Sequence, residues 1–521
     1  MLKFLNEHAN TERASFHMPG HKGSAFYARM GYGSGMPIPD HGMFIPDHGM
    51  FSPDHDITEI PGADDLRHPD GIIKTITDRY AALYGGGRAF ISVNGSSALI
   101  MAAIMTCVRP GHKLLVAADS HISVRNGAKL AGVEIVYVEP QVLEPWGEDQ
   151  VPEPSSEDQM HKPWGEDDEL TRAIADGNTA DSSRAGAGNE ILSAPGSLVN
   201  QGIETSPNCD AASDQSTDVM QHANGCISFP GGLSAKDVAD ALDADPDIDA
   251  VILPSPNYFG IVSDIKTIAE EVHKREKVLI VDQAHGAHLK MFDGLPVSAE
   301  DGFGDRLPVP AKGFGGVLPV PAEECGADIV IVSTHKTMAS FTQTAVANIF
   351  GSCAESGQSV PGGHDESGES TFGGRVDPDE YEKKLLVLES TSPSYILMES
   401  LAVNADIMEK HGSELAASWR ADLDWFYENV KKIPGIRVLS RELIRNAAAE
   451  AASGADLDDS KIVIDFSEIR MSGEEAEKVL MEKGVYPEFS TGSIVMCLTG
   501  IGNVREDYEL LLEALAEIAG K

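Results

Sequence analysis

The stretch IVIVSTHKT, residues 329–337, decides the fold class of this sequence. Its first four residues are apolar and β-branched, which is typical of a strand buried on both faces, and the polar residues after them mark the end of that strand. Similar runs alternate with helical stretches along the chain, and together they occupy residues 89–93, 113–116, 133–138, 250–253, 278–281 and 329–332. Buried strands that alternate with helices predict an α/β fold with a mostly parallel sheet flanked by helices.

Lys336 follows the last of these strands and lies next to His335, with Ser333 just before them. A lysine at the end of a buried strand is partly desolvated, which lowers the pKa of its amine and suits it to Schiff-base chemistry. Ser333 or His335 could then bind the phosphate group of a cofactor. A solvated lysine at a strand end is the alternative, and this segment taken alone favours it. The choice therefore depends on the other motifs.

The stretch VLIVDQAHGAH, residues 278–288, ends another apolar run in Asp282. A carboxylate there could pair with the protonated ring nitrogen of a pyridine cofactor and keep the ring an electron sink. His285 and His288 follow, three residues apart. A metal site made of these three residues is the alternative, but one triplet without a separate further ligand is weak support for it. We therefore expect no metal.

Four more polar side chains follow strands or turns. In AFISVNGSSALIMAAIM, residues 89–105, a helix starts at Ser96 and Ser97, where N–H groups and hydroxyls could hold a phosphate. An ordinary serine N-cap is the alternative. His121 follows the next strand and could lie over a flat cofactor ring and take part in proton transfer as a catalytic residue, or it could be a structural histidine. Tyr258 lies in a loop after a further strand and could touch cofactor or substrate.

Composition limits the classes of partner. The 521-residue chain has 82 acidic and 40 basic residues, and its net charge of −42 would repel nucleic acids and anionic membranes. Because it has no signal peptide and no apolar run of about 18 residues, we expect a cytoplasmic protein. The six cysteines form no CxxC pair, so we expect ordinary thiols rather than disulfides or a zinc site.

The length of the chain predicts more than one domain. We expect an N-terminal segment at residues 1–60, a large cofactor-binding domain at residues 61–400 and a small α/β domain at residues 401–521. Helices at 392–411 and 472–483 and a strand at 494–498 support the last of these. An acidic insertion at about residues 142–224 and loop insertions at about 299–323 and 352–374 are expected, because the strand–helix pattern gives way there to polar sequence, partly duplicated.

Taken together, these segments resemble the Orn/Lys/Arg decarboxylase family of pyridoxal-phosphate (PLP) enzymes, which has the aspartate-aminotransferase fold (fold type I). The matching stretches occur in the family's order between residues 15 and 410. They are HMPGHKG from His17, DITEIPGADDLRHPDGIIK from Asp56, FISVNGSS from Phe90, DSHISVRNGAKLAGVE from Asp119, PNYFGIVSD from Pro256, VDQAHGAH from Val281, STHKT from Ser333 and ESTSPSY from Glu389.

The resemblance implies PLP as the cofactor and assigns its contacts. Lys336 would be the Schiff-base lysine and Asp282 the partner of the pyridine nitrogen, with His121 stacked on the ring, Ala284 packed under it and His285 beside it. The phosphate would be held by a set of polar side chains, namely Ser96, Ser97, Ser333 and His335. The family's active site lies between subunits, so Thr391 and Ser392 are expected to reach the neighbouring site of a homodimer or larger assembly.

The reaction implied is decarboxylation of a basic amino acid to an amine and CO₂, as in polyamine biosynthesis, with arginine favoured over lysine and ornithine. Lys336 or His335 would return the proton to Cα, and Glu488 would bind the cationic end of the substrate. The family's DEAH is DQAH here, with Gln283, and the chain resembles the short forms that lack an extra N-terminal domain. Transamination or elimination with the same cofactor, and a catalytically inactive PLP-binding regulator, are the alternatives.

Overall fold

The computed structural model describes residues 14–22, 24–31, 55–58, 60, 62–146, 220–221, 227–292, 318–351 and 374–520. The expected insertions at 142–224, 299–323 and 352–374 lie almost entirely outside these ranges. All described residues belong to one compact unit. The boundary expected near residue 400 stays a prediction, and a continuous helix runs through that position.

A seven-stranded sheet forms the centre of the structure, in the order β2–β12–β11–β10–β8–β3–β4. Its strands are β2 (Arg88–Ser92), β3 (Lys113–Ala117), β4 (Glu134–Val138), β8 (Ile248–Pro254), β10 (Val278–Asp282), β11 (Ile329–Val332) and β12 (Ala345–Ile349). The strands from β11 to β4 pair in parallel, and β12 is antiparallel to both neighbours. The predicted α/β fold with a mostly parallel sheet is confirmed, and each of the six predicted apolar runs overlaps a strand.

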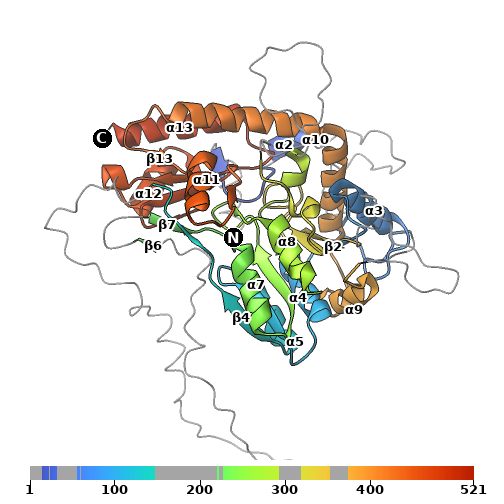
Figure 1. Cartoon of the computed structure of the whole chain (residues 1–521). Helices are drawn as coiled ribbons and strands as arrows, with labels where there is room; N and C mark the ends of the chain where they lie inside the picture. The colour runs from blue at the N-terminus through green and yellow to red at the C-terminus, as the bar shows by residue number, and fades with distance from the viewer. Residues whose placement is uncertain are drawn as a thin grey trace, which may run out of the picture. The chain divides into compact units, whose positions relative to one another are not determined.

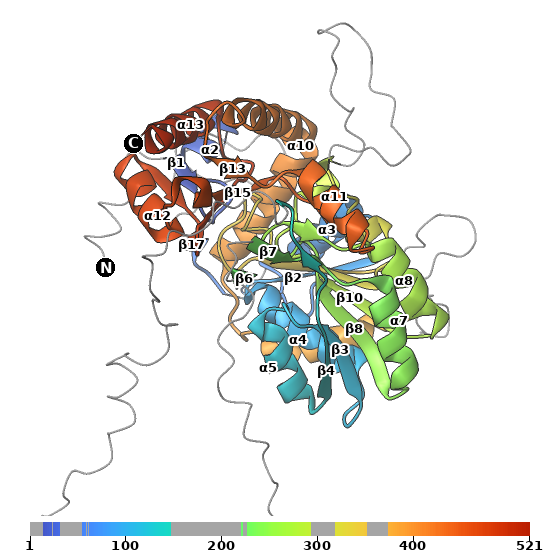
Figure 2. The ribbon, with the colours of Figure 1, turned by 60° about the vertical axis from the view of Figure 1, so that its left-hand side comes forward.

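Helices cover both faces of this sheet (Figure 1). One face carries α4 (Gly95–Cys107), α5 (Ile122–Ala131) and α9 (Pro378–Leu388). The other carries α3 (Ile72–Tyr84), α7 (Ala235–Ala244), α8 (Ile265–Lys274) and α10 (Tyr395–Val430). Figure 2 shows the strands between α4 and α5 on one side and α7 and α8 on the other.

Alternate residues of the central strands enter two different cores, which explains why the runs are apolar throughout. In β11, Ile329 and Ile331 pack with α4, α5 and α9, whereas Val330 and Val332 pack with the helices of the other face. Successive side chains of a strand point to opposite faces. Each such side chain stabilises the fold by roughly 1.5–3 kcal/mol when fully buried, so the sheet is fixed from both sides.

The C-terminal region forms a four-stranded antiparallel sheet in the order β13–β15–β18–β17. Its strands are β13 (Arg437–Val438), β15 (Lys461–Asp465), β17 (Phe489–Thr491) and β18 (Ile494–Leu498), and its helices are α11 (Arg441–Glu450), α12 (Gly473–Glu482) and α13 (Arg505–Ala519). The helix predicted at 392–411 is the first part of α10, and the helix at 472–483 and strand at 494–498 correspond to α12 and β18.

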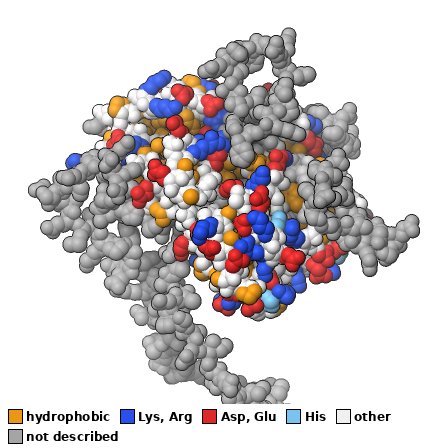
Figure 3. Space-filling model, in the orientation of Figure 1, with side chains coloured by type: hydrophobic (Ala, Val, Ile, Leu, Met, Phe, Trp, Pro, Cys, Tyr) orange, Lys and Arg blue, Asp and Glu red, His pale blue; other side chains and the backbone are white. Residues whose placement is uncertain are grey.

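Shorter elements complete the description. β9 (Ile261–Val262) pairs with β14 (Asp456–Leu457), and β7 (Ile227–Pro230) pairs with β5 (Val142–Leu143) and β6 (Met220–Gln221). Further helical turns are α2 (Ser24–Arg29), η4 (Leu289–Phe292), η5 (Ala322–Glu324) and η6 (Ser467–Ile469). Among the described residues no helix is both long and apolar enough to span a membrane. On the face seen in Figure 3, acidic and basic side chains are interspersed over the described part of the surface.

The N-terminal segment packs between the lysine-bearing loop and the C-terminal region. β1 (Ala14–Phe16) pairs in parallel with β16 (Val485–Pro487). Beyond it, the backbone N–H of Gly20 donates to the carbonyl of His335 at 3.0 Å, and the N–H of Gly502 donates to the carbonyl of Gly20 at 2.9 Å. A Cβ on Gly20 would lie 2.4 Å from the carbonyl carbon of Thr337, so only glycine fits there. This contact holds the backbone next to Lys336.

Candidate active site

The sheet order brings the sequence-predicted polar residues to one edge. Lys336 follows β11, Asp282 ends β10, Tyr258 follows β8 and His121 follows β3, and these four strands are neighbours in the sheet. Because the strands are parallel, their carboxyl ends meet at the same edge, where ligands of open α/β sheets bind. Residues more than two hundred positions apart in the sequence therefore face one site.

Lys336 is half-buried, and its Nζ lies 2.8 Å from Nε2 of His285. Burial lowers the pKa of the Lys336 amine, and the carboxylates of Asp282 and Glu488 oppose that shift. Burial also lowers the pKa of His285 well below its usual value, and the charge of Lys336 adds to the effect. An ammonium group only donates, so a protonated Lys336 donates to Nε2 and leaves the imidazole proton on Nδ1.

Asp282 is buried, and its Oδ1 accepts a hydrogen bond from the N–H of Ala284 at 3.1 Å. Burial raises the pKa of Asp282, and the charges of Lys336 and His121 oppose the rise. The ionised form of a buried carboxylate is stabilised by a cationic partner such as a protonated ring nitrogen. Ala284 itself is buried directly beside this carboxylate.

The start of α4 is the phosphate site that the sequence predicts. Asn94 is the N-cap and makes no side-chain capping hydrogen bond, while Gly95 turns the chain with φ of 79°. Ser96 and Ser97 lie half-buried in the first turn. Neither serine is therefore the N-cap. The N–H of Gly95 donates to the carbonyl of Gln343 at 2.8 Å, so an anion at this helix start would meet the N–H groups and hydroxyls of Ser96 and Ser97.

The two catalytic histidines predicted from the sequence have different surroundings. His121 is exposed and caps α5: its Nδ1 accepts from the N–H of Ser123 at 3.2 Å and lies 2.9 Å from the hydroxyl of that serine. His335 donates from Nδ1 to the carbonyl of Thr344 at 2.9 Å, and burial lowers its pKa to about 4. In this neutral tautomer Nε2 of His335 is an acceptor, so it donates to a phosphate oxygen only after gaining a proton.

The two predicted substrate residues also lie near Lys336. The ring of Tyr258 contacts the ring of His285 edge-on, with centroids 5.3 Å apart. Glu488 accepts a hydrogen bond from the N–H of Met18 at 2.9 Å, and its charge acts on Lys336. Thr391 and Ser392 are exposed between α9 and α10, and no described contact joins them to Lys336 or Asp282.

Sequence reasoning missed a buried polar cluster that joins the lysine loop to the C-terminal sheet. His288, expected only as an alternative metal ligand, has Nδ1 3.2 Å from Oγ1 of Thr337 and Nε2 3.1 Å from Oδ1 of Asp458. All three side chains are fully buried. Burial would raise the pKa of Asp458, but His288 and Lys461 hold it well below its usual range. The residue after Lys336 is thus anchored to the buried pair of His288 and Asp458.

Lys461 is the second missed residue. Its side chain is fully buried and donates to the carbonyl of Asn257 at 3.2 Å. Burial lowers its pKa to about 7, and Asp458 opposes the shift. Lys22, in the HMPGHKG motif, donates to the carbonyls of His17 and Leu498, and burial lowers its pKa to about 7 as well. The motif could have indicated Lys22, whereas Lys461 begins an ordinary strand and gave no signal.

Three buried polar atoms in these loops have no hydrogen-bond partner among the described residues: Oγ of Ser333, Oγ of Ser120 and Nδ1 of His285. Buried polar groups are rarely left unpaired, because each costs about 1–3 kcal/mol. They lie beside Lys336, His121 and Asp282 in the sequence or in space. A polar molecule with a phosphate and a ring nitrogen fits these atoms and the buried carboxylate.

Comparison with known proteins supplies the family. The model of the Orn/Lys/Arg decarboxylase major domain matches residues 1–150 and 227–507. The chain belongs to the Orn/Lys/Arg decarboxylase family. The resemblance stated from the sequence is confirmed, and this decarboxylase family is PLP-dependent.

Similar proteins agree with this placement. The arginine decarboxylase of Bacillus subtilis (strain 168) is 25% identical over 516 residues, which cover 99% of this chain and 76% of the relative. That of Halalkalibacterium halodurans is 24% identical, covering 98% of this chain and 75% of the relative. The crystal structure of the lysine decarboxylase from Francisella novicida has a TM-score of 0.53 at 16% identity and shares the fold. This decarboxylase-family chain matches it over 88% of its own length but over 52% of that longer chain.

Proposed function

We propose that this chain is a PLP-dependent decarboxylase of a basic amino acid, with arginine as the first candidate and lysine or ornithine as the alternatives. Membership of the family and the relatives named arginine decarboxylase support it. The observation that carries the proposal is the amine of Lys336, half-buried at the end of β11, with its Nζ 2.8 Å from His285 and the carboxylate of Asp282 close enough to act on its pKa.

The cofactor contacts follow from the site. Lys336 would hold the aldehyde carbon, Asp282 the ring nitrogen, and Ser96, Ser97, Ser333 and His335 the phosphate, with His121 and Ala284 on the two ring faces. When bound, PLP supplies a sink for the electron pair released as the bond to the carboxylate breaks. The lowered pKa of Lys336 increases the fraction of its amine that is neutral and nucleophilic.

The return of a proton to the substrate Cα is assigned to Lys336 rather than His335. Nε2 of His285 lies 2.8 Å from Nζ of Lys336 and can accept from its ammonium form, whereas Nδ1 of His335 is bonded to the carbonyl of Thr344. Glu488 would bind the cationic end of the substrate and Tyr258 would line its path. Thr391 and Ser392 would serve the neighbouring site of a homodimer or larger assembly in the cytoplasm.

The test measures CO₂ release and amine formation by the purified protein with PLP from arginine, lysine and ornithine, without a keto acid. We expect turnover of one of the three, arginine first, and its loss by at least ~10⁴-fold in Lys336→Ala. Lys266→Ala, which alters an exposed lysine on α8, is the matched control and should keep full activity. Turnover only with a keto acid would identify a transaminase, and PLP binding without turnover of any amino acid would identify a regulator.

A further inference from the structure

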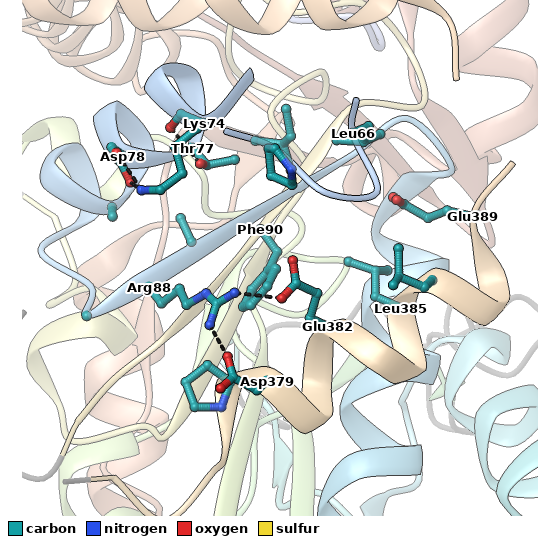
Figure 4. A pocket seen from close by; sticks show the side chains of 17 residues that line it. Leu66, Lys74, Thr77, Asp78, Arg88, Phe90, Asp379, Glu382, Leu385 and Glu389 are labelled. Carbon is teal, nitrogen blue, oxygen red and sulfur yellow. Dashed lines mark hydrogen bonds and ion pairs between the residues drawn. The ribbon is translucent and has the colours of Figure 1, made fainter. Parts of the chain in front are cut away.

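A cavity of about 470 Å³ lies at the β2 edge of the main sheet, between α3, β2 and α9 (Figure 4). Its walls include the buried side chains of Leu66, Phe90 and Leu385. The lining is apolar in part and polar in part, and cavities of this size suit small organic molecules. None of the residues assigned to PLP or the substrate lines it, so it is separate from the Lys336 site.

Glu389, just after α9, points into this cavity (Figure 4). The residue is only 9% exposed, and its Oε1 has no hydrogen-bond partner among the described residues. Burial raises its pKa to about 7, although the hydroxyl of Ser92 donates to the carboxyl group. A buried carboxylate without a cation is costly, and a positively charged ligand would remove that cost.

The other end of the cavity, near the start of α9, also carries excess negative charge. Arg88 is shared between Asp379 and Glu382, with Nη2 2.7 Å from the carboxylate of Glu382. Lys74 is paired with Asp78 at 2.6 Å. With Glu389 ionised, four carboxylates face two cations around the cavity, which leaves two negative charges unbalanced. The lining therefore combines an apolar middle with a carboxylate at one end and an acidic cluster at the other.

We propose that this cavity binds a small alkyl dication, such as a diamine or an aminoalkylguanidine. One cationic group pairs with Glu389, the methylene chain packs against Leu66, Phe90 and Leu385, and the second cationic group meets Glu382 and Asp379. The proposal holds whichever reaction takes place at Lys336. The amines formed by decarboxylation of basic amino acids belong to this ligand class. Such a product could therefore bind the enzyme in this cavity, away from Lys336.

The test is calorimetric titration of the holoenzyme with 1,5-diaminopentane at pH 6 and pH 8, which needs no turnover. We expect one binding event that is lost, or weakened at least ~10-fold, in Glu389→Gln and weakened in Glu382→Gln. Glu513→Gln, an exposed change on α13, is the matched control and should bind as the wild type. Binding should tighten by about tenfold from pH 6 to pH 8, because Glu389 ionises in that range while the amines stay protonated.

Three further readouts decide the outcome. The neutral analogue 1,5-pentanediol should not bind, and Glu389→Gln should lose the pH dependence that the wild type shows. Circular dichroism must give the same spectrum for all variants, and Glu382→Gln tests the other end of the cavity if Glu389→Gln is misfolded. Unchanged affinity and stoichiometry in both glutamate variants, or equal binding of the diol, would overturn the proposal, even if decarboxylation is found.

Discussion

Nε2 of His285 lies 2.8 Å from the amine of Lys336, and the imidazole that provides it is held neutral by burial. A neutral acceptor at that distance stabilises the ammonium form of the lysine. We expect His285→Phe to lower the pKa of Lys336 further, because the ammonium loses its acceptor. The pH profile for the uptake of PLP by the apoenzyme should then have its midpoint at lower pH than in the wild type.

His285→Gln is the control for this change, since its side-chain oxygen also accepts from an ammonium. Its midpoint should lie between those of the wild type and His285→Phe. A midpoint that stays the same in His285→Phe would mean that the contact does not set the protonation of Lys336.

Glu488 is expected to act on the substrate through its charge. Glu488→Gln should raise the KM for the preferred amino acid by roughly 10- to 100-fold, the usual effect of losing a hydrogen bond to a charged group, with a smaller change in kcat. Steady-state kinetics on the three basic amino acids measures this. Glu482→Gln, an exposed change at the end of α12, should leave the KM unchanged. A variant that lost kcat alone would argue against a role in substrate binding.

The buried pair of His288 and Asp458 should matter for stability. Asp458→Asn leaves the imidazole without its ionised partner, which costs about 3–5 kcal/mol when one member of a buried pair is removed. The folded-state pKa of Asp458 is lowered, so its contribution is present above the unfolded pKa near 4 and is lost as the pH falls below it. Urea unfolding at pH 7 and pH 3 should show the difference between variant and wild type shrinking by about 1 kcal/mol at the lower pH.

Asp240→Asn removes a carboxylate from an exposed pair with Lys236 and serves as the comparison. Its free energy of unfolding should be close to that of the wild type at both pH values, because exposed ion pairs contribute little to stability. An equal free energy of unfolding for Asp458→Asn and the wild type would show that the buried pair does not stabilise the fold.

Gly20→Ala should disturb the lysine loop. The new Cβ would lie 2.4 Å from the backbone of Thr337, a contact that forces the backbone apart. We expect a loss of about 1–3 kcal/mol of stability, as for other overpacked positions, together with weaker PLP binding measured by dialysis and absorbance. Gly520→Ala, whose Cβ would meet nothing closer than 3.4 Å, should change neither quantity. Unchanged PLP affinity in Gly20→Ala would show that Gly20 does not affect the geometry of the PLP site.

The sequence pattern predicted the sheet because the relevant signals are local. Six apolar runs gave six strands, and the polar residues at their ends met at one edge because parallel strands require it. β12 was missed because Asn348, fully buried, interrupts its apolar run. His288 contacts Asp458, and Lys461 contacts Asn257. Each contact joins chain segments that are roughly two hundred positions apart, so no local sequence pattern predicts it.

The placement of Gly20 between His335 and Gly502 also constrains the order of events during synthesis. The loop that carries the reactive amine takes its final backbone bonds from residues near both ends of the described chain. The backbone bonds from residues 501 and 502 to Thr337 and Gly20 can therefore form only after nearly the whole described chain has been synthesised.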